Sequence, residues 1–171
     1  MKRPDSAIRL RAPYGIRRAV AADVQAISAV HVAAFAEAYA GIIPDAVIDS
    51  YDIVYRAASW QRIIGAGTIV WVMTEDDLPI GFASIRGEEI GALYLHPGWW
   101  RLGLGRALLV RLLANLRRGG APGAYLWALE ANHRARDFYL ALGGTAGERR
   151  PVVVGPVSLP EVRYDWSFVG D

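Results

Sequence analysis

The sequence predicts a single α/β domain in which a mixed β-sheet is flanked by helices. Its 171 residues are typical of one domain. With 53% hydrophobic residues, the chain can form a sizeable core. Along the chain, apolar residues recur with the periods of strands and helices in the order β-α-α-β-β-β-α-β-α-β-β. Strands and helices that alternate in this way favour one sheet covered by helices.

The N-terminal third predicts a tail, a strand and two helices. Residues 1–15 are basic and interrupted by prolines, so we expect a flexible tail followed by a domain over residues 16–171. The first strand is expected at Ile16 to Val20, and Asp23 stands where a helix N-cap would. Apolar residues at helical spacing predict a helix over Val24 to Ala40, and a weaker pattern predicts a second helix over Asp45 to Ile64.

The central third predicts three strands followed by a helix. Thr68 to Thr74 and Ile80 to Arg86 flank a turn and predict a hairpin, and Glu89 to Leu95 predicts a third strand. A stripe of leucines predicts a helix over Leu104 to Arg118, and two glycines end it.

The C-terminal third predicts three more strands and a short helix. The strand is expected at Ala124 to Leu129 and the helix at Asn132 to Leu142. Two last strands are expected at Val152 to Val157 and Val162 to Phe168, with a turn around Pro160.

Composition excludes several classes of protein. The chain has no cysteine, which excludes disulfides, thiolate metal sites and a cysteine nucleophile. Its net charge is only +2 and its basic residues are dispersed, so no nucleic-acid partner is expected. Its three histidines lack metal-ligand spacing, and we expect no metal. No apolar stretch has the length of a membrane span or of a signal peptide, so we expect no membrane association and a cytoplasmic location.

The segment that bears most directly on function runs from Glu89 to Leu109, where a strand leads through a glycine-containing loop into a helix. The first amides of a helix have no internal partners, and the helix dipole adds positive charge there, so this end suits a phosphate. Gly103 and Gly105 allow close approach, and Arg101 and Arg106 flank the loop. The loop lacks the lysine of a Walker motif, and Leu108 replaces the third glycine of a Rossmann fingerprint. On this loop alone, a tight turn that binds nothing remains an alternative.

A second segment follows at Leu126 to Gly143, where a strand ends and an asparagine begins a helix that carries Phe138 and Tyr139. Together the two segments resemble the GNAT acetyltransferase superfamily. The first is similar to its coenzyme-binding motif Gln/Arg-x-x-Gly-x-Gly/Ala, and the second to its motif Asn-x-x-Ala-x-x-Phe-Tyr-x-x-x-Gly. The resemblance covers about residues 16–168. One departure is that Trp100 stands at the first position of the coenzyme motif, followed by Arg101.

The resemblance implies a mostly antiparallel sheet with a splayed central strand and acetyl-coenzyme A as the acetyl donor. The pantetheine arm would pair with the strand backbone, with an amide of that strand, expected at Leu95, holding the oxyanion. Tyr139 would donate a proton to the departing thiolate. The expected coenzyme-binding residues are Leu93, Tyr94, Leu95, Arg101, Leu102, Gly103, Leu104, Gly105, Arg106, Asn132 and Tyr139.

The base and the acceptor site are less clearly marked. An amine is mostly protonated near neutral pH, so a carboxylate or a chain of waters must remove a proton. Glu89 is the expected base, and Glu88 and Glu130 are further carboxylates at strand ends. The acceptor is expected to meet the first two helices near Phe35 and Tyr39, which could equally be core residues.

Two hypotheses about function remain open at this stage. The first is an N-acetyltransferase that acts on a primary amine of a small molecule, an amino acid or a protein N-terminus. The second is a non-catalytic sensor or interaction module that binds acyl-coenzyme A. Residues Val152 to Val154 could form an exposed sheet edge, and a homodimer is a further expectation.

Overall fold

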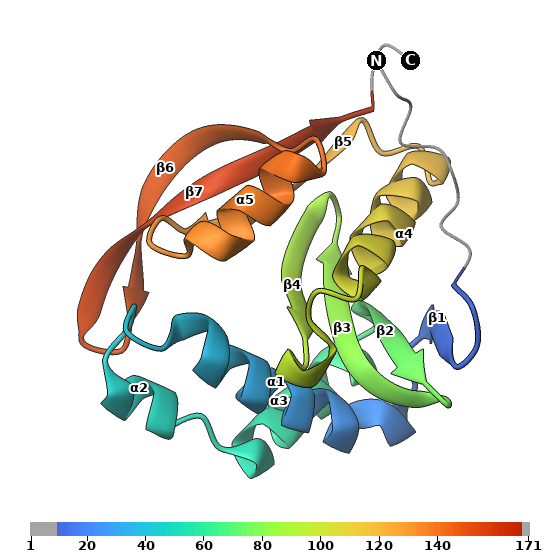
Figure 1. The fold of residues 1–171 in the computed structure, drawn as a ribbon, viewed down its shortest axis with the longest axis horizontal. Helices are drawn as coiled ribbons and strands as arrows, with labels where there is room; N and C mark the ends of the chain where they lie inside the picture. The colour runs from blue at the N-terminus through green and yellow to red at the C-terminus, as the bar shows by residue number, and fades with distance from the viewer. Residues whose placement is uncertain (1–9, 169–171) are drawn as a thin grey trace.

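The computed structural model describes residues 10–168, which form a seven-stranded sheet with the order β1-β2-β3-β4-β5-β7-β6 (Figure 1). The strands are β1 (Tyr14–Arg18), β2 (Ile69–Glu75), β3 (Leu78–Arg86), β4 (Glu89–Leu95), β5 (Gly123–Leu129), β6 (Thr145–Val154) and β7 (Val157–Ser167). The helices are α1 (Val24–Tyr39), α2 (Asp45–Asp49), α3 (Ile53–Gly65), α4 (Leu104–Arg118) and α5 (His133–Ala141). Every helix within the described part is too short or too polar to span a membrane.

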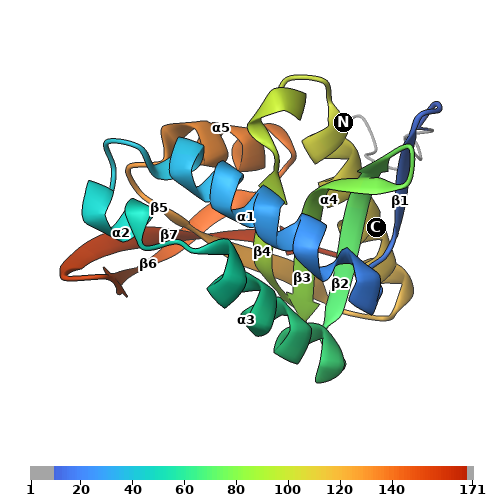
Figure 2. The same ribbon diagram turned by 90° about the horizontal axis from the view of Figure 1, so that it is seen from below.

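Helices cover both faces of the sheet (Figures 1 and 2). On one face, the leucine stripe of α4 and Tyr139 of α5 pack against strand residues such as Ala83, Leu126 and Tyr164. On the other face, α1 and α3 pack against β2 and β3 through a cluster that contains Ile27, Trp60, Val70, Val72 and Phe82. The amphipathic pattern of α4 thus buries the face that the sequence predicts.

The predicted α/β class and mixed sheet are confirmed, and β4 and α4 have the predicted bounds. The single long helix expected from Asp45 to Ile64 is wrong, because the chain forms α2 and α3 with a break at residues 50–52. Asp52 caps the start of α3 by accepting a hydrogen bond from the amide of Tyr55 (3.0 Å). The first strand begins at Tyr14, within the expected tail, whose residues 1–9 lie outside the described part.

The predicted turn around Pro160 is also wrong. The β6–β7 turn lies instead at Gly155 and Pro156, where Gly155 has a φ of 59° that favours glycine. Pro160 lies inside β7 opposite Pro151 of β6, and its carbonyl accepts a hydrogen bond from the amide of Glu130 (2.8 Å). A proline lacks a donor but keeps this acceptor, so it ends no strand here.

The sheet opens between β4 and β5, the pair of parallel strands. Their register contains one pair of residues, Glu89 and Tyr125, and the amide of Tyr125 donates to the carbonyl of Glu88 (3.0 Å). Beyond this point the strands diverge, whereas β5, β7 and β6 continue as an antiparallel unit. The expected splay of the central strand is therefore present, and it creates the opening that holds the site.

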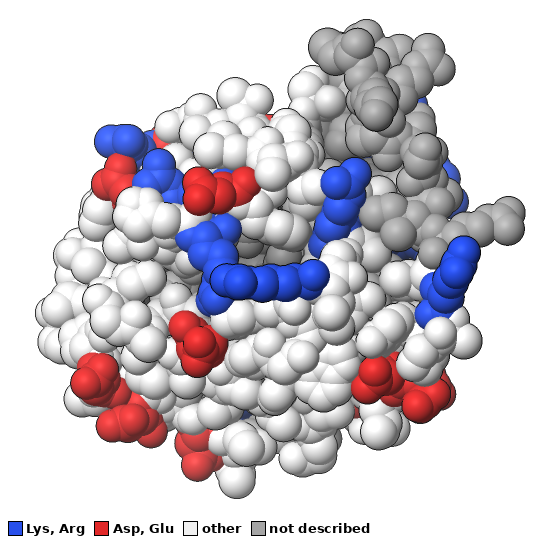
Figure 3. Space-filling view, in the orientation of Figure 1, with Lys and Arg blue, Asp and Glu red and all other residues white. Residues whose placement is uncertain are grey.

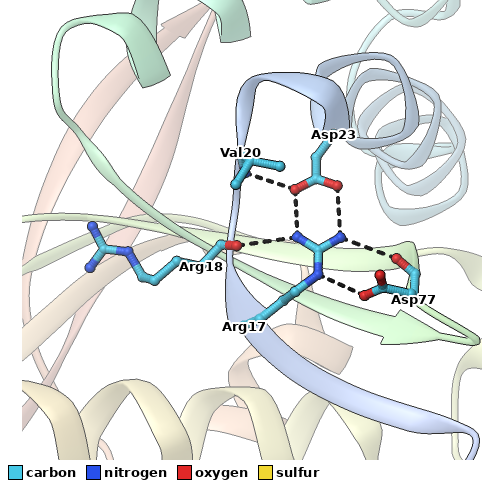
Figure 4. A network of polar contacts seen from close by, with 5 residues as sticks. All are labelled: Arg17, Arg18, Val20, Asp23 and Asp77. Atoms are coloured by element: carbon cyan, nitrogen blue, oxygen red, sulfur yellow. Dashed lines mark hydrogen bonds and ion pairs between the residues drawn. The ribbon is translucent and has the colours of Figure 1, made fainter.

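Arg17 ties the first strand to two other segments (Figure 4). Its guanidinium bonds both carboxylate oxygens of Asp23 (2.7 and 2.9 Å) and the carboxylate of Asp77 (2.8 Å). Asp23 is the N-cap residue of α1, as expected, but its side chain makes no capping hydrogen bond to that helix. Its carboxylate accepts instead from the amide of Val20 (2.8 Å) and from Arg17. Asp76 and Asp77 form the two-residue β2–β3 turn with positive φ (46° and 68°), and the bond to Arg17 stabilises that conformation.

Replacement of Arg17 by Met should lower the free energy of unfolding by about 2 kcal/mol, because it leaves the buried Asp23 carboxylate without its cation. The measurement is urea denaturation at pH 7. The exposed neighbour Arg18, changed to Met, is the matched control and should lose less than about 0.5 kcal/mol. Equal losses in the two variants would contradict the assigned role of the network.

Candidate active site

A cleft of about 460 Å³ fills the opening between β4 and β5. Its walls are the inner edges of the two strands, and its ends are formed by the start of α4, by α5 and by α1. Of the predicted site residues, those that line it are Tyr39, Leu93, Tyr94, Leu95, Arg101, Gly103, Gly105, Arg106, Asn132 and Tyr139. The folding of the sheet thus brings residues from α1, β4, the β4–α4 loop and α5 to one place.

The backbone of β4 offers free hydrogen-bonding groups to the cleft. The amide of His96 donates to the carbonyl of Ile80 on β3 (2.8 Å). Backbone groups of successive residues in a strand point to opposite sides, so the amides of Leu95 and Leu93 point away from β3. Since β5 has diverged there, these groups can pair with an extended ligand, as an added strand would.

The start of α4 provides groups that can bind an anion at one end of the cleft. Gly103, the residue before α4, has a φ of 78°, and Arg101 two residues earlier has a φ of 65°. The amide of Ala107 donates to the carbonyl of Gly103 (3.0 Å), so the amides of the preceding helical residues stay available to a ligand. Leu102 is exposed and Leu104 is buried in the core, and neither side chain lines the cleft.

Three arginines, Arg101, Arg106 and Arg134, line this end, and no ion pair is found for them within residues 10–168. Figure 3 shows basic side chains gathered around a hollow in the middle of the face on which Figure 1 places α4 and α5. Unpaired cations around free helix amides suit a ligand with several phosphate charges.

Trp100 links the loop to α5. Its indole Nε1 donates to the carbonyl of Leu95 (2.6 Å), and the guanidinium of Arg134 lies 3.6 Å from its ring centroid. The tryptophan that departs from the family motif thus fastens the loop to the end of β4 and holds a cation at the cleft. Sequence analysis missed both roles. The sequence did contain one indication of the second role, because Arg134 lies in the first turn of the helix that follows Asn132.

Two residues of the α5 segment line the cleft: Asn132, just before the helix, and Tyr139, near its C-terminal end. The side-chain oxygen of Asn132 accepts from the amide of Ala135 (3.1 Å), so Asn132 is the N-cap of α5 and also lines the cleft. Tyr139 is buried, and burial raises the pKa of its phenol well above the usual value. The phenol therefore stays protonated at neutral pH and can donate a proton.

The other end of the cleft is lined by α1. Ala34 and Ala38 leave room beside the hydroxyl of Tyr39, which lies 3.5 Å from the hydroxyl of Tyr94. Phe35, expected to bind the acceptor, instead packs in the core with its ring stacked on Tyr51 at a centroid distance of 3.5 Å. One helical step of about 100° separates Phe35 from Ala34, so the two residues face different surroundings.

Glu89, the expected base, lies where β4 and β5 still pair and does not line the cleft. Among the residues that the structure describes, the cleft lining contains no carboxylate and no imidazole. The same part of the chain contains no group of three or more His, Cys, Asp or Glu residues arranged to hold a metal ion. The ionisable groups of the lining are arginines and tyrosines.

His31 lies behind Tyr94 in a cluster of aromatic rings. Its ring centroid is 4.8 Å from that of Tyr94, and its Nδ1 accepts a hydrogen bond from the indole of Trp60 (3.1 Å). Burial, with a smaller contribution from the charge of Arg56, lowers the pKa of His31 to about 4. His31 is therefore neutral at pH 7 and supports the position of Tyr94.

The fold and this cleft together define an acyltransferase domain of the GNAT type. The profile of the acetyltransferase (GNAT) family matches residues 34–143, more than half of the chain, and the chain belongs to this family of N-acetyltransferases. The uncharacterized N-acetyltransferase YuaI of Bacillus subtilis (strain 168) is 29% identical over 160 residues, 88% of this chain and 91% of that protein.

Two other proteins illustrate the range of similarity. The mycothiol acetyltransferase of Thermobifida fusca (strain YX) is 36% identical over 85 residues, which are 46% of this chain but only 25% of that protein. The PaiA N-acetyltransferase of Thermoplasma acidophilum, whose crystal structure is a complex with coenzyme A, has a TM-score of 0.74 and 18% identity. That match covers 91% of this chain and 99% of the other, and it confirms the expected GNAT fold.

Replacement of His31 by Gln should reduce the loss of stability at acidic pH. In the native state His31 binds its proton only near pH 4, whereas in the unfolded chain it does so near pH 6.5, so unfolding is favoured progressively as pH falls between these values. The wild type should lose up to about 3 kcal/mol more than the variant between pH 7 and pH 4. Gln keeps an acceptor for Trp60.

Urea denaturation at several pH values is the measurement. The exposed His133, changed to Gln, is the matched control and should leave the wild-type pH dependence unaltered. If the His31 variant declined as steeply as the wild type, another group would be responsible for the pH dependence.

Proposed function

We propose that this protein transfers the acetyl group of acetyl-coenzyme A to a primary amine by direct attack in a ternary complex. The amine nitrogen forms a bond to the thioester carbonyl carbon, the carbon–sulfur bond breaks, and the thiolate takes up a proton. The products are an N-acetyl amide, coenzyme A and one proton from the acceptor ammonium. The observation that carries this proposal is one cleft that joins a phosphate-binding end, a free strand edge and a protonated phenol.

The donor end of the cleft fits the coenzyme in charge and in shape. The amides at the start of α4 and the unpaired Arg101, Arg106 and Arg134 would hold the pyrophosphate. The pantetheine arm would pair with the free edge of β4 at Leu93 and Leu95. The coenzyme A in the structure of the PaiA enzyme supports the same class of donor for this fold.

Two groups would serve the chemistry of the thioester. The amide of Leu95, which points into the cleft, would donate to the oxyanion of the tetrahedral intermediate. Tyr139 would donate its proton to the leaving thiolate, because its raised pKa keeps the proton on the phenol until the thiolate forms. Tyr39 would lie at the acceptor end.

The absence of a carboxylate or an imidazole from the described cleft lining favours one alternative, a protein that binds acyl-coenzyme A without turnover. Release of free thiol from acetyl-coenzyme A in the presence of amines separates the two functions. A primary-amine acceptor, a cytoplasmic location and a homodimer stay predictions. The exposed edge strand β6 supports the dimer.

Replacement of Gly103 by Glu should abolish micromolar binding of acetyl-coenzyme A, measured by isothermal titration calorimetry. The new carboxylate would stand at the anion site and repel the phosphates. Gly120 at the other end of α4 is the matched control, since its φ of 81° is close to the 78° of Gly103 and neither position has an atom within 4 Å of an added Cβ. Gly120→Glu has the same backbone strain and should bind normally. Lack of binding by the wild type would overturn the proposed function.

Replacement of Tyr139 by Phe should lower the rate of thiol release about 100-fold and change the Kd for acetyl-coenzyme A less than about twofold, since only the proton donor is removed. Tyr125 on β5, which does not line the cleft, is the control, and Tyr125→Phe should retain full activity. Unchanged turnover in Tyr139→Phe would exclude Tyr139 as the acid.

A further inference from the structure

Trp127 lines the cleft but takes no part in holding the donor or in protonating the thiolate. It lies in the middle of β5 and is half-buried. Among the described residues it belongs to none of the apolar clusters that form the core. A large ring that lines a cleft and is not used in core packing is available to a ligand.

The alternation of side chains along β5 turns Trp127 toward α1. Trp127 shares its face of the strand with Leu129, whereas Leu126 and Ala128 lie on the opposite face. Leu129 packs in one cluster with Tyr39 of α1, and Leu126 and Ala128 pack in the cluster that contains the leucines of α4. Helices α1 and α4 cover opposite faces of the sheet (Figures 1 and 2). The indole therefore lies on the α1 side of the opening, where the acceptor end is proposed.

Arg150 and Glu161 hold the indole in place. The guanidinium of Arg150 lies 3.8 Å from the ring centroid of Trp127, and its Nε donates to a carboxylate oxygen of Glu161 (2.6 Å). Arg150 reaches from β6 across β7 to β5, so residues of three strands position one ring. The guanidinium covers one face of the indole and its charge is balanced by Glu161. The surface that the ring leaves for the cleft is therefore apolar.

The wall of the cleft on α1 is made of small residues. Ala34 and Ala38 lie one turn apart on the same side of the helix, and both line the cleft. Helix α1 packs over β3 and β4, whereas Trp127 projects from β5 on the other side of the opening. This part of the cleft is thus bounded by methyl groups on one side and by a flat ring on the other.

The α1 side of the cleft has no charged group among the described residues. The charged residues of the lining are Arg101, Arg106 and Arg134, which border the starts of α4 and α5. The polar side-chain atoms beside α1 are the hydroxyls of Tyr39 and Tyr94, which lie 3.5 Å apart. A second charge on the acceptor would lose its hydration here without gaining a partner, which is costly. An apolar ring would bury its surface against the indole and the methyl groups.

We propose that Trp127 is a specificity-determining residue that binds the substituent of the acceptor amine, and that the acceptor is an arylalkylamine without a second charge. The aromatic group of the acceptor lies between the indole and the alanines of α1, and its amine reaches the thioester beside β4. This inference rests on the proposed function and narrows the acceptor from any primary amine to one chemical class.

The test measures thiol release from acetyl-coenzyme A with methylamine, butylamine, phenethylamine and diaminobutane as acceptors. The wild-type kcat/KM for phenethylamine should exceed that for methylamine by at least about tenfold, because the ring buries apolar surface. Diaminobutane should react about tenfold less well than butylamine, because its second ammonium group finds no partner. A diamine that reacts as well as phenethylamine would overturn the inference.

Replacement of Trp127 by Ala should raise the KM for phenethylamine about tenfold, and should change kcat and the kcat/KM for methylamine less than about twofold. Trp127→Phe keeps a flat apolar ring and should retain most of the preference. Tyr125→Ala is the matched control. Tyr125 lies on the same face of β5 with the guanidinium of Arg163 stacked on it (3.9 Å), but it does not line the cleft, so the preference should be unchanged.

The opposite wall gives an independent check. Ala38→Leu narrows the space across from the indole and should lower the kcat/KM for phenethylamine at least about fivefold more than that for methylamine. Equal effects on the two amines would contradict the proposed position of the aromatic group.

The remaining outcomes separate this inference from the proposed function. An equal loss of activity toward all four amines in Trp127→Ala would indicate a structural role and overturn the inference, as would an unchanged preference. Titration with acetyl-coenzyme A should give each variant a Kd within about twofold of wild type. A wild type that prefers diaminobutane would leave acetyl transfer intact and remove only the acceptor class. A wild type that binds the coenzyme but releases thiol with no amine would contradict acetyl transfer itself, and the acceptor class with it.

Discussion

The divergence of β4 from β5 after a single pair of residues is the constraint on which the whole site depends. If the two strands stayed paired, the amides of Leu93 and Leu95 would be used within the sheet, and no cleft would separate α5 from α1. The sheet tolerates this opening because the strands of each half form their own continuous set of hydrogen-bonded pairs. On one side β1 to β4 pair in order, and on the other β5, β7 and β6 form their own antiparallel unit. Core packing by α4 spans the opening.

Charge is distributed unevenly along this opening. At the end formed by α4 the arginines have no carboxylate partners among the described residues, and free helix amides add to their field. On the C-terminal half of the sheet, Arg149, Arg150 and Arg163 each pair with a carboxylate. This distribution of charge supports the proposed placement of a polyanionic donor at the α4 end of the cleft. Trp100 and Trp127 each hold one arginine at the border of the cleft.

Burial rather than close ion pairing sets the protonation states of the phenols that line the cleft and of the imidazole behind them. It raises the pKa of Tyr39, Tyr94 and Tyr139, so all three phenols carry protons at neutral pH, and it lowers the pKa of His31, which stays neutral behind them. A group of neutral hydroxyls can pass protons without the cost of placing a bare charge in the cleft.

Local signals in the sequence determined where most elements begin and end. Glycines, caps and the leucine stripe act within a few residues, so the bounds of β4 and α4, the loop between them and the position of Tyr139 on α5 could all be predicted. The break between α2 and α3 and the β6–β7 turn depend on weaker signals and were misplaced. Only the tertiary structure decided which side chains meet at the cleft. It placed Phe35 in the core and Glu89 where β4 and β5 still pair, and it brought Trp100 to Arg134 and Tyr39 to Tyr94. These pairs lie far apart along the chain, and their contact follows from strand order and register, which no local pattern encodes.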